Sequence, residues 1–401
     1  MQNVTKSVLI SGLCLLIVTL IVGAPAIAQD TLPLVGPLLA ANTVEQDAVL
    51  LYDLDSDRVR ELRLDDRRAH HVWDFSPDGC RVLLTLAEGT LPARLISVRL
   101  DGSDPRELVQ FDELSAAEWG VWEPDWSPDG EDEAGRIAFT MLRGRGETLT
   151  THIAWVPGTG GTPEFYSATG REFTPQWSPD GGWLAYVSYD ERAAGASVFA
   201  TAVPTPEPPP GQTPPPPVLL NEADLWVVSA DGETKTRLTR FSTGSVSMPR
   251  WSPDGELVGF VYSPSPNNDT LWMIANQAES IPTQLSFQWH LALDLTWLPD
   301  STAMIGALRD FRQQAANRLW QIPLVGSADE LSLEVLSDLN LAYADYPRYS
   351  PDGRWLAVRS AYALALVDLE VRTVQTLPER FVGNTPVVWS PTGFSGEAAC
   401  D

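Results

Sequence analysis

The sequence predicts an all-β protein, a seven-bladed β-propeller of four-stranded antiparallel blades. The first observation is a short turn motif that begins with an aromatic residue and recurs seven times, with starts 51, 51, 74, 46, 52 and 40 residues apart. The second is that short apolar runs follow each of the first six turns, and repeats of roughly 40–50 residues built from short strands are typical of propeller blades. The copies of the motif are Phe75–Gly79, Trp126–Gly130, Trp177–Gly181, Trp251–Gly255, Trp297–Ser301, Tyr349–Gly353 and Trp389–Gly393.

Each copy of the motif has the residues that a tight turn requires. In Trp177-Ser-Pro-Asp-Gly181, the proline fixes φ at the first central position and the aspartate tolerates the second. The glycine then adopts the positive φ that returns the chain into a partner strand. The motif therefore predicts a hairpin between the first and second strands of each repeat.

Two apolar runs follow each turn, and a short last strand such as Arg237–Thr239 or Thr283–Leu285 completes the repeat. Runs of three to six residues rich in β-branched and aromatic side chains, bounded by Gly, Pro, Asp and Asn, indicate strands. The first runs are Val82–Leu86, Ile137–Phe139, Leu184–Val187, Leu257–Val261, Met304–Ala307 and Leu356–Val358. The second runs are Leu95–Val98, Ile153–Trp155, Leu225–Val228, Leu271–Ile274, Leu319–Ile322 and Leu364–Val367.

The aromatic residue that leads each motif is expected to fill the interface between blades. No blade can bury both faces of its sheet alone, so the repeats must pack on one another in a ring. A large apolar ring with at most one polar atom suits that interface. The alternative is that the 15 tryptophans form a sugar-binding platform.

The ring is expected to close by sharing one blade between the two ends of the chain. The last motif is followed only by Phe394 to Asp401, which is too short for the rest of a blade. Leu38–Ala41, Ala48–Tyr52 and Val59–Leu62 match the second, third and fourth strands of a blade, and Pro386–Ser390 would supply the first. This closure gives seven blades, with six or eight as the alternatives.

Residues 1–28 have the pattern of a secretory signal peptide. Lys6 gives a positive start, Val8–Val22 an apolar stretch, and Ala26-Ile-Ala28 a cleavage site before Gln29. The alternative is an uncleaved membrane anchor. We therefore expect a signal peptide at 1–28, a single propeller domain at 29–401, and an exported protein that is periplasmic, at the cell surface or extracellular.

The charge of the chain argues against nucleic-acid and membrane-surface binding. After removal of residues 1–28 the chain has 26 basic and 53 acidic residues, and Lys235 is its one lysine. A strongly acidic surface repels phosphate groups and anionic lipid. We expect no nucleic-acid partner, contact with the membrane only through an uncleaved signal segment, and a monomer.

A proline-rich segment, Val203–Val218, interrupts the third complete repeat. Such a sequence prefers extended polyproline II and cannot join a central strand ladder. We expect an excursion on the surface, with a dedicated ligand for a partner domain as the alternative.

The motifs of known catalysts are missing from the sequence. It has no G-x-S-x-G motif, and the adjacent pair His70-His71 is the one histidine cluster. Adjacent strand residues point to opposite faces, so this pair is not expected to share a metal. We predict no catalytic residue, no metal site and no cofactor. The ligand-binding candidates are residues of the loops that surround the channel: Arg143, Arg171, Trp289, His290, Arg309 and Arg312.

Cys80 and Cys400 are the two cysteines that remain after removal of the signal peptide. Export permits a disulfide. Cys80 follows the first complete motif, and Cys400 lies seven residues past Gly393 of the last one, a span of up to ~23 Å when extended. We predict a bond that ties the C-terminus to the neighbouring blade, with two free thiols as the alternative.

The repeated sequence resembles the TolB-like propeller repeat of the WD40-like (PD40-type) group. The resemblance rests on Trp177–Gly181, Leu184–Val187 (LAYV), Leu225–Gly232 (LWVVSADG) and Arg237–Thr239 (RLT), and its repeats cover about Leu38 to Gly393. Members of this group include periplasmic partners of the Tol–Pal envelope system, propeller domains fused to serine peptidases, and pectin-fragment lyases. The chain lacks the α/β domain of TolB, the hydrolase domain of the peptidases and the histidine-rich metal site of the lyases, so we expect a free-standing propeller.

The resemblance implies an exported, non-catalytic scaffold that binds a protein, a peptide or a cell-envelope component on one face of the ring. The alternative is an enzyme, a glycan lyase or hydrolase with its site over the central channel. Three or more His, Asp or Glu side chains converging on one point would favour the enzyme.

Overall fold

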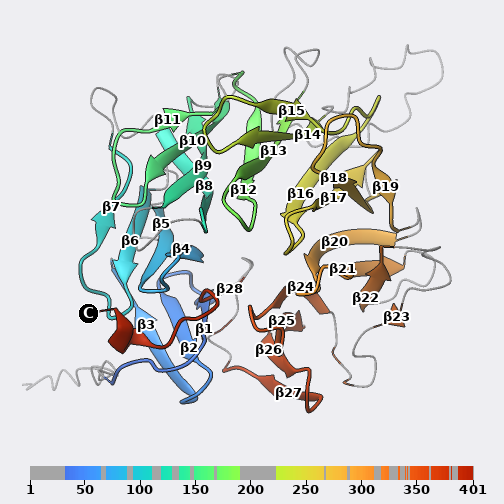
Figure 1. Cartoon of the computed structure of the whole chain (residues 1–401). Coiled ribbons are helices and arrows are strands. Elements are labelled where there is room, and N and C mark those ends of the chain that lie inside the picture. Colours follow the sequence, from blue (N-terminus) through green and yellow to red (C-terminus); the bar gives the residue numbers. More distant parts are fainter. Residues whose placement is uncertain are drawn as a thin grey trace, which may run out of the picture.

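The repeats fold into an all-β propeller, in which sheets surround a central axis (Figure 1). The computed structural model describes residues 32–64, 69–87, 94–110, 119–128, 135–144, 149–166, 169–189, 223–265, 268–286, 290–310, 318–324, 333–334, 339, 341, 344–360, 363–378, 381 and 387–400. The predicted signal peptide and the proline-rich segment lie outside these residues. None of the helices in the described residues has the length and apolar character needed to cross a membrane.

Five of the sheets have four strands each, and three of these lie in the N-terminal part of the chain. The first contains β1 (Leu38–Asn42), β2 (Val49–Asp53), β3 (Arg58–Leu62) and the last strand of the chain, β28 (Val388–Trp389). The second contains β4 (Ala69–Phe75), β5 (Arg81–Ala87), β6 (Arg94–Arg99) and β7 (Arg106–Glu107). The third contains β8 (Trp119–Trp126), β9 (Arg136–Arg143), β10 (Thr150–Pro157) and β11 (Glu164–Phe165).

The remaining two four-stranded sheets lie near the C-terminal end of the chain. One contains β20 (His290–Trp297), β21 (Ala303–Asp310), β22 (Arg318–Pro323) and β23 (Leu333–Glu334). The other contains β24 (Ala344–Tyr349), β25 (Trp355–Ser360), β26 (Ala363–Asp368) and β27 (Thr373–Thr376).

Two repeats in the middle of the chain share one eight-stranded sheet. It contains β12 (Glu172–Trp177), β13 (Trp183–Tyr189), β14 (Ala223–Ser229), β15 (Lys235–Arg237), β16 (Ser245–Trp251), β17 (Leu257–Ser263), β18 (Thr270–Ala275) and β19 (Thr283–Gln284). The two halves meet where β14 pairs with β16 in parallel at Ala223 and Ser245, and the amide of Ala223 donates to the oxygen of Gly244. The described residues thus form five separate four-stranded blades and one eight-stranded sheet. The prediction of seven separate four-stranded blades is therefore wrong.

Strands from both ends of the chain form one sheet. Leu39 pairs with Trp389 and Ala40 with Val388, so that β28 extends the sheet of β1, β2 and β3. The amide of Leu38 donates to Ser390 Oγ, and the amide of Ser390 donates to the oxygen of Leu38, each at 2.9 Å. The ring therefore closes by the shared blade that the sequence predicts.

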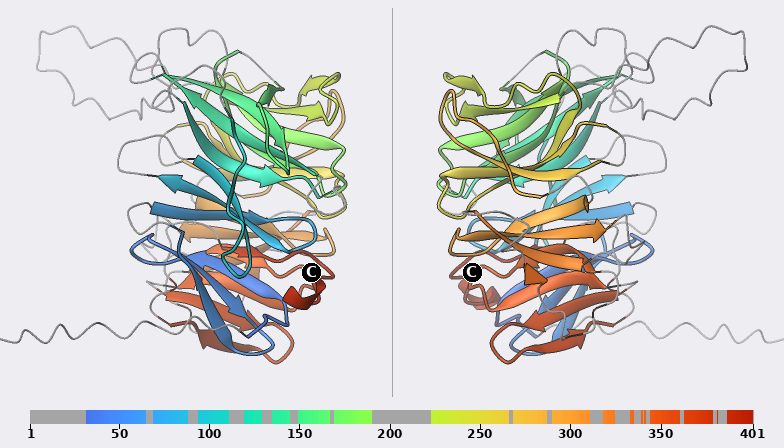
Figure 2. Two further views of the ribbon diagram at one scale, coloured as in Figure 1. Left: turned by 90° about the vertical axis from the view of Figure 1, so that its left-hand side faces the viewer. Right: turned by 90° about the vertical axis from the view of Figure 1, so that its right-hand side faces the viewer.

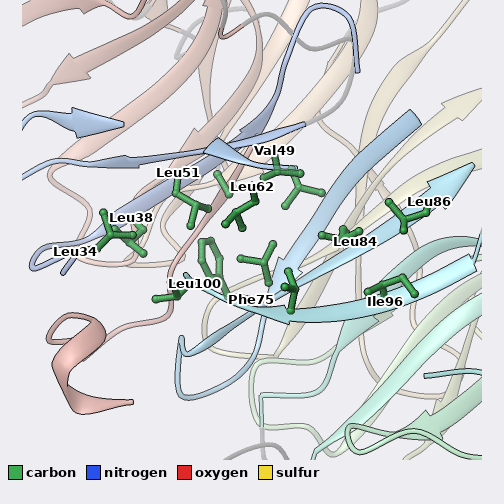
Figure 3. Close-up of a cluster of buried hydrophobic side chains, with 14 residues drawn as sticks. Leu34, Leu38, Val49, Leu51, Leu62, Phe75, Leu84, Leu86, Ile96 and Leu100 are labelled. Carbon is green, nitrogen blue, oxygen red and sulfur yellow. The ribbon is translucent and has the colours of Figure 1, made fainter. Parts of the chain in front are cut away.

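Apolar side chains of neighbouring sheets pack together between the blades. Figure 3 shows one such cluster, in which Leu38, Val49 and Leu51 of the first sheet face Phe75 and Leu84 of the second. Five of the aromatic residues that lead the motifs are buried in these interfaces, and Tyr349 and Trp389 are partly buried; Trp126, for example, is 4 % exposed. Their position agrees with the wedge between blades that the sequence predicts.

The C-terminal segment docks on the ring through the 3-10 helix η5 (Glu397–Ala399), which lies at one face (Figure 2). The amide of Leu34 donates to Glu397 Oε2 at 3.0 Å, and Arg60 Nη1 donates to Glu397 Oε1 at 2.7 Å. Cys400 forms a disulfide with Cys80, with the Cα atoms 5.4 Å apart. The last turn of the chain is thus held on the turn between β4 and β5.

Candidate ligand-binding site at the central channel

The first strand of each repeat lies nearest the central axis (Figure 1). In β4, β8, β12, β16, β20 and β24 a bulge shifts the pairing of this strand with the next. The pairing of β8 with β9 shifts between Trp122 and Asp125, and β12, β16 and β24 shift at the equivalent points. A proline lies in each of these four bulges: Pro124, Pro175, Pro249 and Pro347. Proline has no N–H for the ladder, and a bulge tolerates it.

The residue before each of these prolines has a left-handed backbone. Glu123, Thr174, Met248 and Tyr346 have φ of 49°, 52°, 53° and 50°. Non-glycine residues adopt this region rarely, and a backbone of this kind is found most often at functional sites. The recurring proline two positions before the motif was visible in the sequence, and it is the signal that could have located these residues.

Charged and polar residues immediately before the motif aromatics link neighbouring repeats. Asp74 Oδ2 accepts from the amide of Trp126 at 2.9 Å, and Asp125 Oδ2 accepts from the amide of Trp177 at 2.6 Å. Arg348 Nη1 donates to Asp294 Oδ2 at 2.8 Å. Each bond joins one repeat to the next around the channel.

These groups lie close enough to shift one another's pKa. Removal of water raises the pKa of Asp74 and that of Asp125, and the negative charge of Asp74 raises that of Asp125 further. Desolvation and the positive charge of Arg348 lower the pKa of Arg250, while Asp294, Glu123 and Asp125 act in the opposite direction. The channel therefore contains a mutually coupled set of acidic and basic side chains.

One mouth of the channel is a cup formed by the motif turns themselves. This cavity of about 420 Å³ is lined by motif aromatics and prolines, and by Asp125, Gln176 and Arg250 behind them. Trp251 and Trp297 donate their indole N–H groups to carbonyls of the preceding repeats, so these rings are held in place. The cup is therefore built from residues that also hold the blades together.

The opposite mouth holds a second cavity, of about 470 Å³, at the other ends of the same strands. We call it the aromatic pocket. It is lined by Trp122, Glu123, Leu142, Phe173, Thr174, Val187, Tyr189, Val246 and Ser247. Six of these nine side chains are aromatic or aliphatic, as is typical of ligand sites of this size.

Aromatic contacts hold the walls of the aromatic pocket. The rings of Phe173 and Tyr189 meet edge to face with centroids 5.4 Å apart, and those of Trp73 and Trp122 meet at 5.5 Å. Trp122 is nevertheless 44 % exposed. A large aromatic surface is therefore fixed in orientation and open to solvent.

The aromatic pocket contains a carboxyl group and a hydroxyl group that are both shielded from water. Removal of water raises the pKa of Glu123 to about 7, although the positive charge of Arg250 and a hydrogen bond with the side chain of Trp122 act to lower it. Thr174 Oγ1 is buried and has no hydrogen-bond partner among the described residues. This hydroxyl group fits a site in which a ligand supplies the missing partner.

The ligand-binding candidates of the sequence fall at different places around the ring. Arg143 ends β9 beside Leu142 of the aromatic pocket, and its guanidinium lies 4.9 Å from the ring centroid of Trp119. Arg171 bridges Thr151 just before β12. Arg309 pairs with Leu291, and the backbone of His290 with Asp310, in another sheet. Trp289 and Arg312 lie outside the described residues.

The sequence reasoning missed the aromatic pocket, because it looked for ligand contacts in loops rather than on the bulged strands. The structure places Arg143 and Arg171 near that pocket and does not bring Arg309 to it. Within the described residues, no group of three or more His, Cys, Asp or Glu side chains is arranged to hold a metal ion.

The chain has recognisable relatives in sequence, although no family model matches it. It is 25 % identical over 253 residues to the uncharacterized peptidase YuxL of Bacillus subtilis. The match covers 63 % of this chain and 31 % of that peptidase. The chain thus spans about a third of the length of this relative.

Solved structures with the same architecture belong to proteins of several kinds. Puromycin hydrolase, solved as its S511A mutant, has a TM-score of 0.58 at 13 % identity, with 88 % of this chain and 53 % of that chain covered. The oligogalacturonate lyase of Vibrio parahaemolyticus has a TM-score of 0.53 at 13 % identity, with 86 % and 92 % covered. TolB of Acinetobacter baumannii has a TM-score of 0.47 at 14 % identity, with 89 % and 66 % covered. The first two show that the chain shares the propeller fold.

Proposed function

We propose that the chain is an exported, non-catalytic β-propeller that binds a protein, a peptide or a cell-envelope component at the mouth of the channel that carries the aromatic pocket. The observation that carries this proposal is the aromatic pocket itself, which combines fixed aromatic walls with an exposed Trp122. Aromatic residues are the commonest anchors of recognition surfaces, because they bury a large area with few rotamers to fix.

Export is supported by the sequence and by the cysteines. Residues 1–28 have the three regions of a signal peptide. Cys80 and Cys400 are joined, and disulfides persist in oxidising compartments. Both observations suit a protein that works outside the cytoplasm.

The ring is best counted as seven repeat units. Five are the separate four-stranded sheets, and the other two are the halves of the eight-stranded sheet, which carry their own motifs at Trp177 and Trp251. The halves are joined by a single parallel bridge, at Ala223 and Ser245. The aromatic pocket is lined by both halves and by the repeat before them.

The alternative function is an enzyme, a glycan lyase or hydrolase with its site over the channel. One observation supports it: a carboxyl group with a pKa of about 7, as in Glu123, can take up and release protons at neutral pH. Turnover of oligosaccharides by residues 29–401 that disappears in Glu123→Gln would establish this alternative.

Affinity capture from envelope extract tests the proposed function. Immobilised residues 29–401 should retain an envelope component, and Trp122→Ala should lose it. The matched control is Ile281→Ala, another exposed apolar residue, in the turn between β18 and β19 on the face of the ring that carries the motif turns. Equal retention by both variants, or loss with the control alone, would place binding elsewhere.

A further inference from the structure

The aromatic pocket has an unusual combination of walls and charge. Its aliphatic and aromatic side chains suit an apolar group, yet Glu123 places a carboxyl group among them. A ligand that fills this pocket must bury its own surface against both. A neutral apolar ligand would satisfy the walls but would add no partner to the carboxyl group beyond its hydrogen bond with the side chain of Trp122.

The carboxyl group is fixed in its place by the backbone. Glu123 occupies the bulge of β8 at φ 49°, before Pro124, and the pairing with β9 resumes at Asp125. An ordinary strand would carry this residue in the ladder, and the bulge turns it toward the channel. The same left-handed backbone occurs at Thr174, Met248 and Tyr346, so the bulge of the repeat itself holds this position.

A cation in the pocket would stabilise the ionised form of Glu123. Removal of water raises the pKa of Glu123, of Asp125 and of Asp74, so burial favours the protonated forms of these carboxyl groups, and Asp294 is already paired with Arg348. Arg143, at the rim, has its guanidinium over the ring of Trp119. The net charge of −26 for the whole chain also draws cations toward the surface.

The aromatic walls suit a cation as well as a carbon chain. The faces of tryptophan, tyrosine and phenylalanine attract ammonium and guanidinium groups within about 6 Å. Trp122, Phe173 and Tyr189 supply three such rings around one cavity. The same chain already pairs a guanidinium with an indole at Arg143 and Trp119.

We infer that the aromatic pocket binds a basic side chain of a peptide or protein partner, a lysine or an arginine, with its aliphatic stem against Leu142, Phe173 and Val246 and its charged end at Glu123. This inference rests on the proposed function, because it names the chemistry of the ligand for that face. The stem replaces water on the apolar walls, and the charged end adds an ion pair to Glu123, which already has a hydrogen bond with the side chain of Trp122.

Three blocked tripeptides test the inference by calorimetric titration of residues 29–401. They differ only in the central residue, which is lysine, norleucine or glutamate, so that norleucine keeps the stem of lysine without its charge. We expect the lysine peptide to bind at least about tenfold more tightly than the norleucine peptide, and the glutamate peptide to bind most weakly. A tenfold difference corresponds to one charge-assisted hydrogen bond of ordinary strength.

Single-residue variants test which side chains cause the preference for the lysine peptide. Glu123→Gln, which keeps the shape of the side chain, should reduce the affinity for the lysine peptide to that for norleucine, whereas the exposed control Glu256→Gln should leave the tenfold ratio unchanged. Trp122→Ala should weaken both peptides together. Equal binding of lysine and norleucine by the unmodified chain, or binding of none of the three peptides, would overturn the inference without any variant. Capture of an envelope component that depends on Trp122 would then still support the proposed function.

Discussion

The indole N–H of Trp297 donates to the main-chain oxygen of Arg250, 2.9 Å away in the preceding repeat. Trp251 makes the same bond to Gln176 and Trp389 makes it to Arg348, at 2.9 and 3.1 Å. In each case the acceptor immediately precedes the aromatic residue of the neighbouring motif. The motif therefore holds the ring together by a bond as well as by apolar packing.

Trp297→Phe should lower the free energy of unfolding more than Trp126→Phe does. Both changes shorten a buried ring, but only Trp297 loses a hydrogen bond, since the buried Nε1 of Trp126 has no partner among the described residues. We expect a difference of about 1 kcal/mol, the net value of one such bond. Urea denaturation measures it, and equal losses for the two variants would show that the bond adds nothing.

Loss of the disulfide should destabilise the exported protein. The bond between Cys80 and Cys400 spans 320 residues of sequence, so its removal frees a long loop in the unfolded chain. Cys400→Ser should cost ~2–5 kcal/mol, less any effect of residual structure in the unfolded chain. Denaturation with and without reductant measures the change, and Cys400→Ser should no longer respond to reductant. Peptide mapping that finds two free alkylatable thiols would contradict the bond.

Stability should fall as the pH rises through the range in which Glu123 titrates. Burial raises its pKa from 4.5 to about 7, so the folded state retains a proton that the unfolded state releases between these values. The groups that face it are Trp122, which shares a hydrogen bond with it, Arg250 of β16, Tyr189 of β13 and Asp125 of its own strand. The raised pKa of Asp125 acts in the same direction.

Glu123→Gln should remove this part of the pH dependence. From pH 5 to pH 8, the free energy of unfolding of this variant should rise relative to that of the unmodified chain. For Glu256→Gln, the difference from the unmodified chain should be the same at the two pH values. Denaturation midpoints at the two pH values decide the matter. A constant difference between Glu123→Gln and the unmodified chain would mean that folding does not raise the pKa of Glu123.

Deletion of Pro204–Pro217 should leave the fold intact. These residues lie outside the described part of the chain, but Tyr189 and Ala223 on either side pair directly in the hairpin of β13 and β14. Shortening a surface loop changes its closure entropy by only about 1 kcal/mol. A fall in the melting temperature of more than about 5 °C would show that the segment packs on the ring.

The sequence predicted the repeat well because each motif acts locally. Proline, aspartate and glycine fix a turn wherever they occur, and Ser76–Gly79 and Ser350–Gly353 close the turn by the same main-chain bond. The shared blade followed from counting strands at the two ends. The joining of β14 to β16 depends on a single bridge between the first residues of the two strands, Ala223 and Ser245, and no local sequence pattern predicts it.

The aromatic pocket was harder to predict, because its walls come from three repeats. Leu142 and Phe173 look like ordinary strand residues in the sequence, and only the ring brings them together. The proline after Glu123 indicated a bulge, but the sequence did not show that the bulged strand lines the channel. Arg143 was predicted from its loop, and the structure places it beside Leu142, on the ring of Trp119.

Site-specific photo-crosslinking in the cells that express the protein tests the central claim most directly. A photoreactive residue in place of Trp122 or Tyr189 should form adducts with an envelope component. The same residue in place of Ile281 or Val371 should form none, because both are exposed in turns on the face of the ring that carries the motif turns. Adducts only from positions 281 and 371, or none from any of the four, would contradict binding at the aromatic pocket.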